Sequence, residues 1–138
     1  MADVGQGVFI KLDFADGGKC EYARTFLIIN KIDNKLHLIN VSSIKGKEWK
    51  LGFNSNKQMN NSNPPFLKKS FAKLDALYIV PDSEFIDQKI LCNKRRIHPI
   101  ELKDIINHHN KFREKNKINI KEYLFEDIKQ MNSELVLI

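Results

Sequence analysis

Two neighbouring apolar segments, residues 22–30 and 36–43, constrain the fold more than any other part of the chain. The first reads YARTFLIIN: an arginine precedes an unbroken β-branched and aromatic run, which is typical of a strand covered on both faces. The second reads LHLINVSS and ends in paired hydroxyl residues. A short turn around Asp33-Asn34-Lys35 links them, so we expect two consecutive strands that pair with each other.

Further strands are predicted on both sides of this pair. Residues 7–14 alternate between apolar and polar side chains, and an Asp-Gly-Gly turn at 16–18 opens a mobile loop that leads to Arg24. Residues 49–53 also alternate, which predicts a fourth strand. Residues 77–80 fit a strand better than the competing helix. Short strands with tight turns indicate a small antiparallel barrel or sandwich.

The pattern changes to helical beyond Pro81. Pro99 suits a helix-opening position, and an apolar stripe at helical spacing follows it. The stripe consists of Leu102, Ile105, Ile106, His109 and Phe112. A second helix is predicted from Tyr123, Leu124, Ile128 and Met131, after a strongly cationic segment over 111–121. We therefore predict one mainly β domain with appended helices (α+β) over 1–138, with a barrel core at 5–82 and a helical extension at 83–138 packed on it.

Composition limits the classes of partner. The chain has 138 residues and a formal net charge of +6, which favours a polyanion such as nucleic acid or an anionic membrane surface. No basic leader and no apolar run of membrane-spanning length is present, so we expect a soluble cytoplasmic protein. Cys20 and Cys92 lie far apart and outside any CxxC pattern, so we expect both to be reduced thiols.

Arg24 and Ser42 are the first candidates for chemistry. Arginine stays protonated and can donate a forked pair of hydrogen bonds to a phosphate, although a solvated ion pair is the commoner role at such a position. The Ser42 hydroxyl can bind a phosphate oxygen, although it can equally cap a turn. Ser43 and Lys45, which follow on the same segment, are included as substrate-binding candidates. If the two strands pair, the cation and the hydroxyl can lie at one edge of a sheet.

Metal and cofactor chemistry find no support in the sequence. His37, His98, His108 and His109 show no metal-ligand spacing, because His108 and His109 point to different faces of a helix and no HExxH occurs. No Walker loop and no GxGxxG motif is present. We expect neither a metal nor a nucleotide cofactor.

The order of these features resembles the MazF/PemK family of toxin endoribonucleases over about residues 5 to 82. Residues 7–14 are similar to the family's opening strand, and the glycine-bearing loop ending in Arg24, followed by Phe26–Ile29, is similar to its loop and Arg-Pro-apolar strand. Leu38–Ser43 resembles the strand that ends in Thr or Ser. Lys69–Asp75 resembles a later segment with a serine, an apolar stretch and an acidic residue.

This resemblance implies an SH3-like barrel, usually a homodimer, that cleaves single-stranded RNA without a metal. The attacking 2′-hydroxyl would leave a 2′,3′-cyclic phosphate and a 5′-hydroxyl. Arg24 would stabilise charge on the scissile phosphate, Ser42 would hold that phosphate, and Asp75 would contact RNA. Glu21 and Tyr22 would lie on a loop that closes over the substrate. An antitoxin, either a protein or an RNA, would neutralise the activity.

Two alternatives stay open at this point. Thr25 stands where the family usually has proline, and Ala76 and Tyr78 replace polar residues after Asp75, which is compatible with a non-enzymatic SH3-like barrel that binds RNA or protein. The long basic C-terminal region is compatible with a toxin that is inhibited by an RNA antitoxin.

Overall fold

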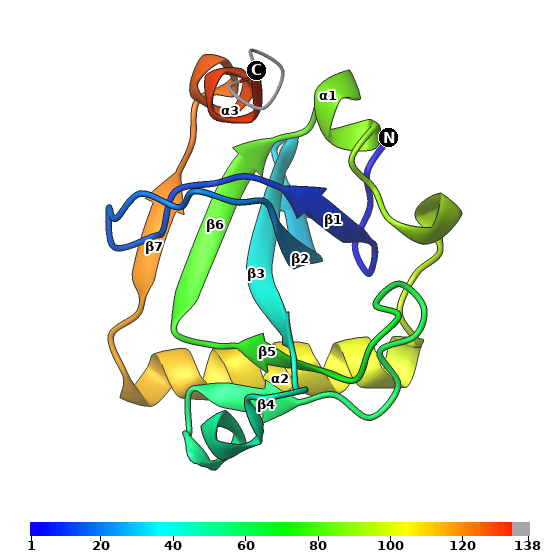
Figure 1. Ribbon diagram of the computed structural model, residues 1–138, viewed down its shortest axis with the longest axis vertical. Helices are drawn as coiled ribbons and strands as arrows, with labels where there is room; N and C mark the ends of the chain where they lie inside the picture. The colour runs from blue at the N-terminus through cyan, green and yellow to red at the C-terminus, as the bar shows by residue number, and fades with distance from the viewer. Residues whose placement is uncertain (134–138) are drawn as a thin grey trace.

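The computed structural model describes residues 1–133, and within them the chain forms a seven-stranded sheet (Figure 1). The strands are β1 (Gly7–Ile10), β2 (Arg24–Ile32), β3 (Lys35–Ser43), β4 (Asn56–Gln58), β5 (Ser70–Lys73), β6 (Ala76–Pro81) and β7 (Asn119–Glu122). All strand pairs are antiparallel except β6 and β7, which run parallel. The fold is therefore mainly β, with the helices added around the sheet.

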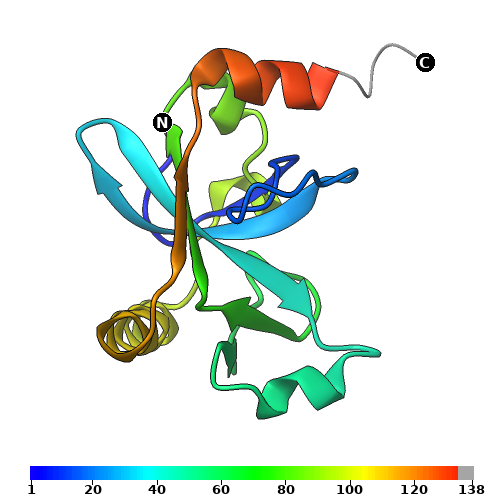
Figure 2. The ribbon, with the colours of Figure 1, turned by 90° about the vertical axis from the view of Figure 1, so that its left-hand side faces the viewer.

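Strand β3 makes the sheet bend, because its two halves pair with different neighbours. Its first half pairs with β6, from Lys35 opposite Pro81 to Leu38 opposite Tyr78, and its second half pairs with β5. The strands diverge at this point and cross at a steep angle in Figure 2. Within residues 1–133 no pairing joins β4 or β7 back to β1, so the structure shows an open, curved sheet where the sequence predicted a closed barrel.

The predicted central pair of strands is confirmed. β2 and β3 pair from Thr25 opposite Val41 to Ile32 opposite Lys35, with an irregularity between Ile28 and Asn30. Phe26, Leu27 and Ile28 are fully buried in succession, as expected for a strand with both faces covered. β1 is shorter than predicted: it ends at Ile10, and the chain then turns back on itself, with the Phe14 amide donating to Gly18 O at 2.8 Å.

The predicted strand at 49–53 is wrong, because these residues form a 3-10 helix, η1 (Glu48–Gly52). Gly46, with φ +78°, turns the chain before it, and the Lys50 amide donates to Lys47 O at 2.9 Å. Trp49 and Phe53 are four residues apart, a spacing that fits one helical turn as well as it fits alternate positions of a strand. The segment that follows, residues 54–63, contains the short strand β4 and the buried Met59.

Strand β6 confirms the prediction of a strand at 77–80. Its outer neighbour β7 was not predicted, because its residues lie in the cationic segment and Ile120 is exposed. β7 pairs in parallel with β6, from Ala76 opposite Asn119 to Ile79 opposite Glu122.

The helices lie at opposite ends of the sheet, with α2 at the bottom of Figure 1 and α3 at the top. The helical elements are α1 (Glu84–Asp87), η2 (Cys92–Lys94), α2 (Pro99–Lys115) and α3 (Phe125–Ser133). Pro99 opens α2 as predicted, and the side chain of His98 accepts a hydrogen bond from the Ile100 amide. The sequence predicted a helical extension over 83–138, and its last five residues, 134–138, lie outside the described residues.

Two apolar clusters form the core, one on each face of the sheet. Phe26, Leu38 and Tyr78 belong to the cluster that also contains Ile128 of α3. Leu27, Ile39 and Leu77 belong to the other cluster, where Ile105 of α2 packs. Neighbouring residues of β2 and β3 thus enter different clusters, as the alternation of side chains along a strand requires. Among residues 1–133, no helix is both long enough and apolar enough to cross a bilayer.

Burial of His109 on α2 makes the fold sensitive to acid. The side chain is 1% exposed, and burial together with the charge of Arg113 lowers the pKa of His109 from 6.5 to about 4. The unfolded chain therefore binds this proton as the pH falls through 6.5, whereas the folded chain stays neutral until about pH 4. We expect this one residue to reduce the free energy of unfolding by about 3 kcal/mol between these pH values.

Urea unfolding of the wild type and of His109→Phe, at neutral and at mildly acid pH, measures this contribution. We expect the variant to lose less stability on acidification than the wild type. The control is His108→Phe, because the neighbouring His108 side chain is 46% exposed. Equal acid sensitivity in the wild type and His109→Phe would contradict the assignment.

Candidate functional site

Arg24, the first residue of β2, is held in place by an aromatic enclosure. Its guanidinium carbon lies 4.4 Å from the centre of the Phe14 ring, 5.2 Å from that of Phe26 and 5.4 Å from that of Tyr78. Its Nη2 donates to Leu12 O at 3.0 Å. Cation–π contacts and this hydrogen bond fix the orientation of the charged group before any ligand arrives.

The Arg24 guanidinium keeps unused donors. A guanidinium carries five N–H groups, and Nη1 makes only a long contact of 3.5 Å with the Tyr78 hydroxyl. The Nε atom is buried and has no hydrogen-bond partner among the described residues. A half-buried guanidinium with fixed orientation and donors left over at Nη1 and Nη2 is suited to an oxyanion, and a phosphate matches its geometry.

Arg24 lines a small cleft of about 150 Å³. The loop after β1, the start of β2, the connection between β5 and β6 and the start of β7 all contribute to its walls. The lining residues are Phe14, Ala15, Asp16, Arg24, Asn40, Lys73, Asp75, Ala76, Tyr78 and Asn119. The β5–β6 connection is tied to β7, since the Asn119 amide donates to Asp75 O at 3.1 Å.

Lys73 adds a second cation to the cleft, whose lining also carries the carboxylates of Asp16 and Asp75. Burial lowers the pKa of the Lys73 ammonium, and the neighbouring positive charges of Lys50 and Arg24 lower it further. The Asp75 carboxylate acts in the opposite direction, and Lys47 again lowers the pKa. These cations repel one another across a partly dehydrated space, so a bound anion would relieve the repulsion.

Ser42 belongs to the same face of the sheet as Arg24. Thr25 pairs with Val41, so continuing the antiparallel register by one residue sets Arg24 beside Ser42. The Ser42 hydroxyl accepts a hydrogen bond from Lys47 Nζ at 3.0 Å. Ser42 does not line the Arg24 cleft itself. Its partner Lys47 is one of the lysines whose charge acts on Lys73 in the cleft wall.

The remaining predicted site residues are dispersed. Asp75 lines the cleft, and its contact with a substrate stays a prediction. Ser43 follows Ser42 directly and therefore points to the opposite face of the sheet. Glu21 and Tyr22 are exposed on the loop before β2, and Glu21 lines a different cavity. Lys45 is exposed in the turn after β3.

The cleft also contains three polar residues that the sequence did not single out: Lys73, Asn40 and Asn119. Lys73 ends a short apolar strand two residues after Phe71, which places it on the face that also carries Ser42 opposite Phe71. A lone lysine at the end of such a strand was the available signal. Asn40 is buried in β3, where its side-chain amide donates to Thr25 O at 2.9 Å. Asn119 enters through β7, which the sequence did not reveal.

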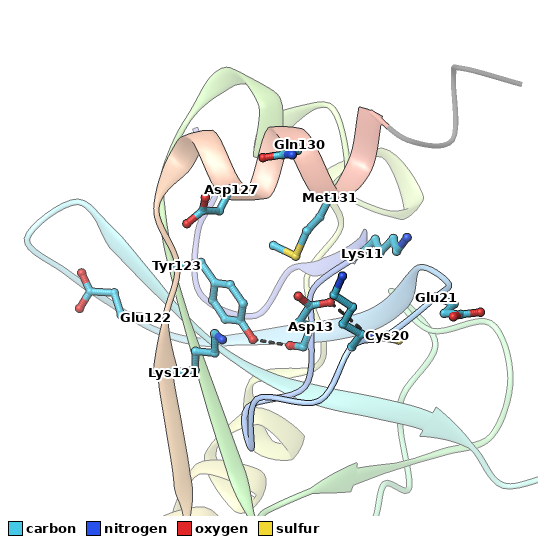
Figure 3. A pocket seen from close by; sticks show the side chains of 11 residues that line it. Lys11, Asp13, Cys20, Glu21, Lys121, Glu122, Tyr123, Asp127, Gln130 and Met131 are labelled. Atoms are coloured by element: carbon cyan, nitrogen blue, oxygen red, sulfur yellow. Dashed lines mark hydrogen bonds between the residues drawn. The ribbon is translucent and has the colours of Figure 1, made fainter.

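A second, larger cavity of about 620 Å³ lies between the loop after β1 and the β7–α3 segment (Figure 3). The Tyr123 hydroxyl donates to Asp13 O, which ties the loop after β1 to the β7–α3 segment. Within that loop, the Cys20 amide donates to the Asp13 carboxylate at 3.2 Å. Burial raises the pKa of Tyr123, so the phenol stays protonated. The lining carries the acidic side chains of Asp13, Glu21, Glu122 and Asp127 beside Lys11, Lys19 and Lys121. This lining has more carboxylates than cations, whereas the Arg24 cleft has as many cations as carboxylates, so the larger cavity suits a phosphate less well.

The histidines and cysteines do not converge. No group of three or more His, Cys, Asp or Glu side chains within residues 1–133 could hold a metal ion. Cys20 and Cys92 are both free thiols, with Cys20 buried. The polar groups that line the Arg24 cleft are its two cations, the carboxylates of Asp16 and Asp75, two side-chain amides and the Tyr78 hydroxyl.

The chain is similar to known proteins in its fold and not in its sequence. No protein-family model matches the sequence, and no curated protein matches it. Among solved structures, the chain is similar to one described as an endoribonuclease in complex with its cognate antitoxin from Mycobacterial species. The alignment has a TM-score of 0.57 and 10% identity, and it covers 84% of this chain and 98% of that chain. The likeness shows a shared fold.

Proposed function

We propose that this protein is a metal-independent endonuclease of single-stranded RNA and the toxin of a toxin–antitoxin system. The observation that carries the proposal is the fixed Arg24 guanidinium, with unused donors, facing a cleft shared with Lys73. The fold likeness to an endoribonuclease supports it independently, as does the ordered resemblance to the MazF/PemK family. We accordingly regard the curved sheet as a variant of that family's SH3-like barrel.

In the proposed reaction, the 2′-oxygen of one nucleotide attacks the adjacent phosphorus and loses its proton. The bond from phosphorus to the 5′-oxygen breaks, and that oxygen takes up a proton. The products are a 2′,3′-cyclic phosphate and a 5′-hydroxyl. Arg24 and Lys73 stabilise the negative charge that grows on the phosphoryl oxygens, and fixed cations aimed at developing charge need no metal. The Ser42 hydroxyl, bonded to Lys47, holds a neighbouring phosphate oxygen.

The test is incubation of the purified protein with a long single-stranded RNA in the presence of EDTA. We expect cleavage at a restricted set of positions, because a small cleft admits one nucleotide geometry at a time. RNA that stays intact under these conditions would overturn the proposal. Salt-sensitive RNA binding without cleavage would instead favour a non-enzymatic RNA-binding domain.

We extend the proposal to the partners of the toxin. The fold neighbour is described in complex with an antitoxin, so we propose an antitoxin for this chain, a protein in the first instance. We also propose a single domain over 1–138, a homodimer and a cytoplasmic location, as in the MazF/PemK family. Copurification of a discrete small RNA in place of a protein would identify an RNA antitoxin.

A further inference from the structure

Two large aromatic side chains stand out from the surface at η1. Trp49 is 66% exposed and Phe53 is 51% exposed. Their ring centres lie 5.7 Å apart with the planes at 88°, so each ring supports the other. Leaving this much aromatic surface in water forgoes burial energy, and such adjacent exposure marks a binding surface.

The pair is fixed relative to the Arg24 cleft. The side-chain amide of Asn56 donates to Lys50 O at 2.9 Å, and its backbone amide donates to Phe53 O at 3.0 Å. The Leu74 amide donates to Ser55 O at 2.7 Å, which ties this segment to the residue directly after Lys73. In Figure 1 the helical turn of η1 lies next to β4 at the lower edge of the molecule.

Positive charge joins the aromatic pair to the cleft. Lys50 Nζ lies 5.4 Å from the centre of the Trp49 ring, and the charge of Lys50 acts on Lys73 in the cleft wall. Lys47 acts on Lys73 as well and donates to Ser42. Arg24, Lys47 and Lys50 therefore lie close enough to Lys73 to act on its charge, and Lys50 also contacts the Trp49 ring.

We propose that Trp49 and Phe53 form a stacking platform for a base of the single-stranded RNA whose phosphate lies in the Arg24 cleft. This inference rests on the proposed function and extends it by a second contact along the strand. Exposed rings beside a cationic track are how proteins hold single strands, because every base offers a flat face and every nucleotide a phosphate. The flanking residues 45–48 and 54–58 are almost entirely polar and include three lysines, a setting that suits a nucleic-acid strand.

Trp49 is the single tryptophan of the sequence, so its fluorescence reports on the platform alone. The probe is a short 2′-O-methyl oligouridylate, which cannot be cleaved by attack of its own 2′-oxygen. We expect saturable quenching by this probe and none by inorganic polyphosphate of equal charge. We also expect Trp49→Ala with Phe53→Ala to weaken binding of a labelled probe about tenfold or more.

The matched control is Leu124→Ala, because Leu124 is also 66% exposed and lies just before α3. Absent quenching, equal quenching by polyphosphate, or equal affinity of the control and the double variant would each overturn the platform. RNA cleavage without quenching would reject the platform and leave the nuclease intact. Quenching without RNA cleavage would reject the nuclease and leave the platform as an RNA-binding surface.

Discussion

We expect replacement of Arg24 with alanine to lower the rate of the proposed RNA cleavage by about 10²–10³-fold, the usual cost of losing one fixed donor to a developing oxyanion. The Arg24 guanidinium is half-buried, lines the cleft and is held by three aromatic rings, so water cannot easily replace it. Arg24→Lys recovers part of the loss, because an ammonium restores the charge but not the fork of donors. Single-turnover cleavage of one labelled RNA gives the rates for the wild type, Arg24→Ala and Arg24→Lys.

The control for Arg24 must separate chemistry from folding. Arg24 also packs on Phe14, Phe26 and Tyr78, so the variant's unfolding is followed by circular dichroism, and rates are compared only where it is folded. Arg95→Ala removes the same charge from an exposed position after η2 and is expected to cleave at the wild-type rate. Folded Arg24→Ala that cleaves as fast as Arg95→Ala would exclude Arg24 from the reaction.

Lys73 gives the second large effect, which depends on pH. Burial and the neighbouring cations lower the pKa of Lys73, so its ammonium loses its proton at a lower pH than an ordinary lysine does. Cleavage that needs this charge falls as the pH rises through that lowered value. We expect Lys73→Met to lose about 10²-fold in rate near neutral pH, by the same donor argument.

Lys73→Arg supplies the matched comparison, because a guanidinium stays protonated throughout the alkaline range. We expect it to retain most of the activity and to move the alkaline fall in cleavage rate to higher pH. An alkaline fall at the same pH in wild type and Lys73→Arg would show that another group titrates. Full activity in Lys73→Met would remove Lys73 from the cleft's function.

The central strands could be predicted because burial on both faces leaves an unmistakable pattern. Residues 26–29 are apolar without alternation, and the two clusters that cover β2 account for that run. Arg24 could be singled out because it is a cation placed just before this run. The helix at Pro99 was predictable from its opening proline and its apolar stripe.

The parts that failed depend on contacts between distant segments. β7 pairs with β6 across about forty residues of sequence, and its own residues are polar or exposed, so no local pattern reveals it. The alternation of Trp49, Leu51 and Phe53 predicted a strand because alternate apolar side chains usually pack against a core. The rings of Trp49 and Phe53 face solvent, so that reason does not hold here. Lys73 acquires its role only when the β5–β6 connection meets Arg24. Such placements follow from the topology and not from local spacing.

The most direct test of the account is the chemistry of the RNA ends produced in EDTA. We expect a 2′,3′-cyclic phosphate on one fragment and a 5′-hydroxyl on the other, with cleavage abolished when the nucleotide before the break carries a 2′-deoxyribose. Fragments that carry a 5′-phosphate and a 3′-hydroxyl, or undiminished cleavage at that deoxy position, would contradict it.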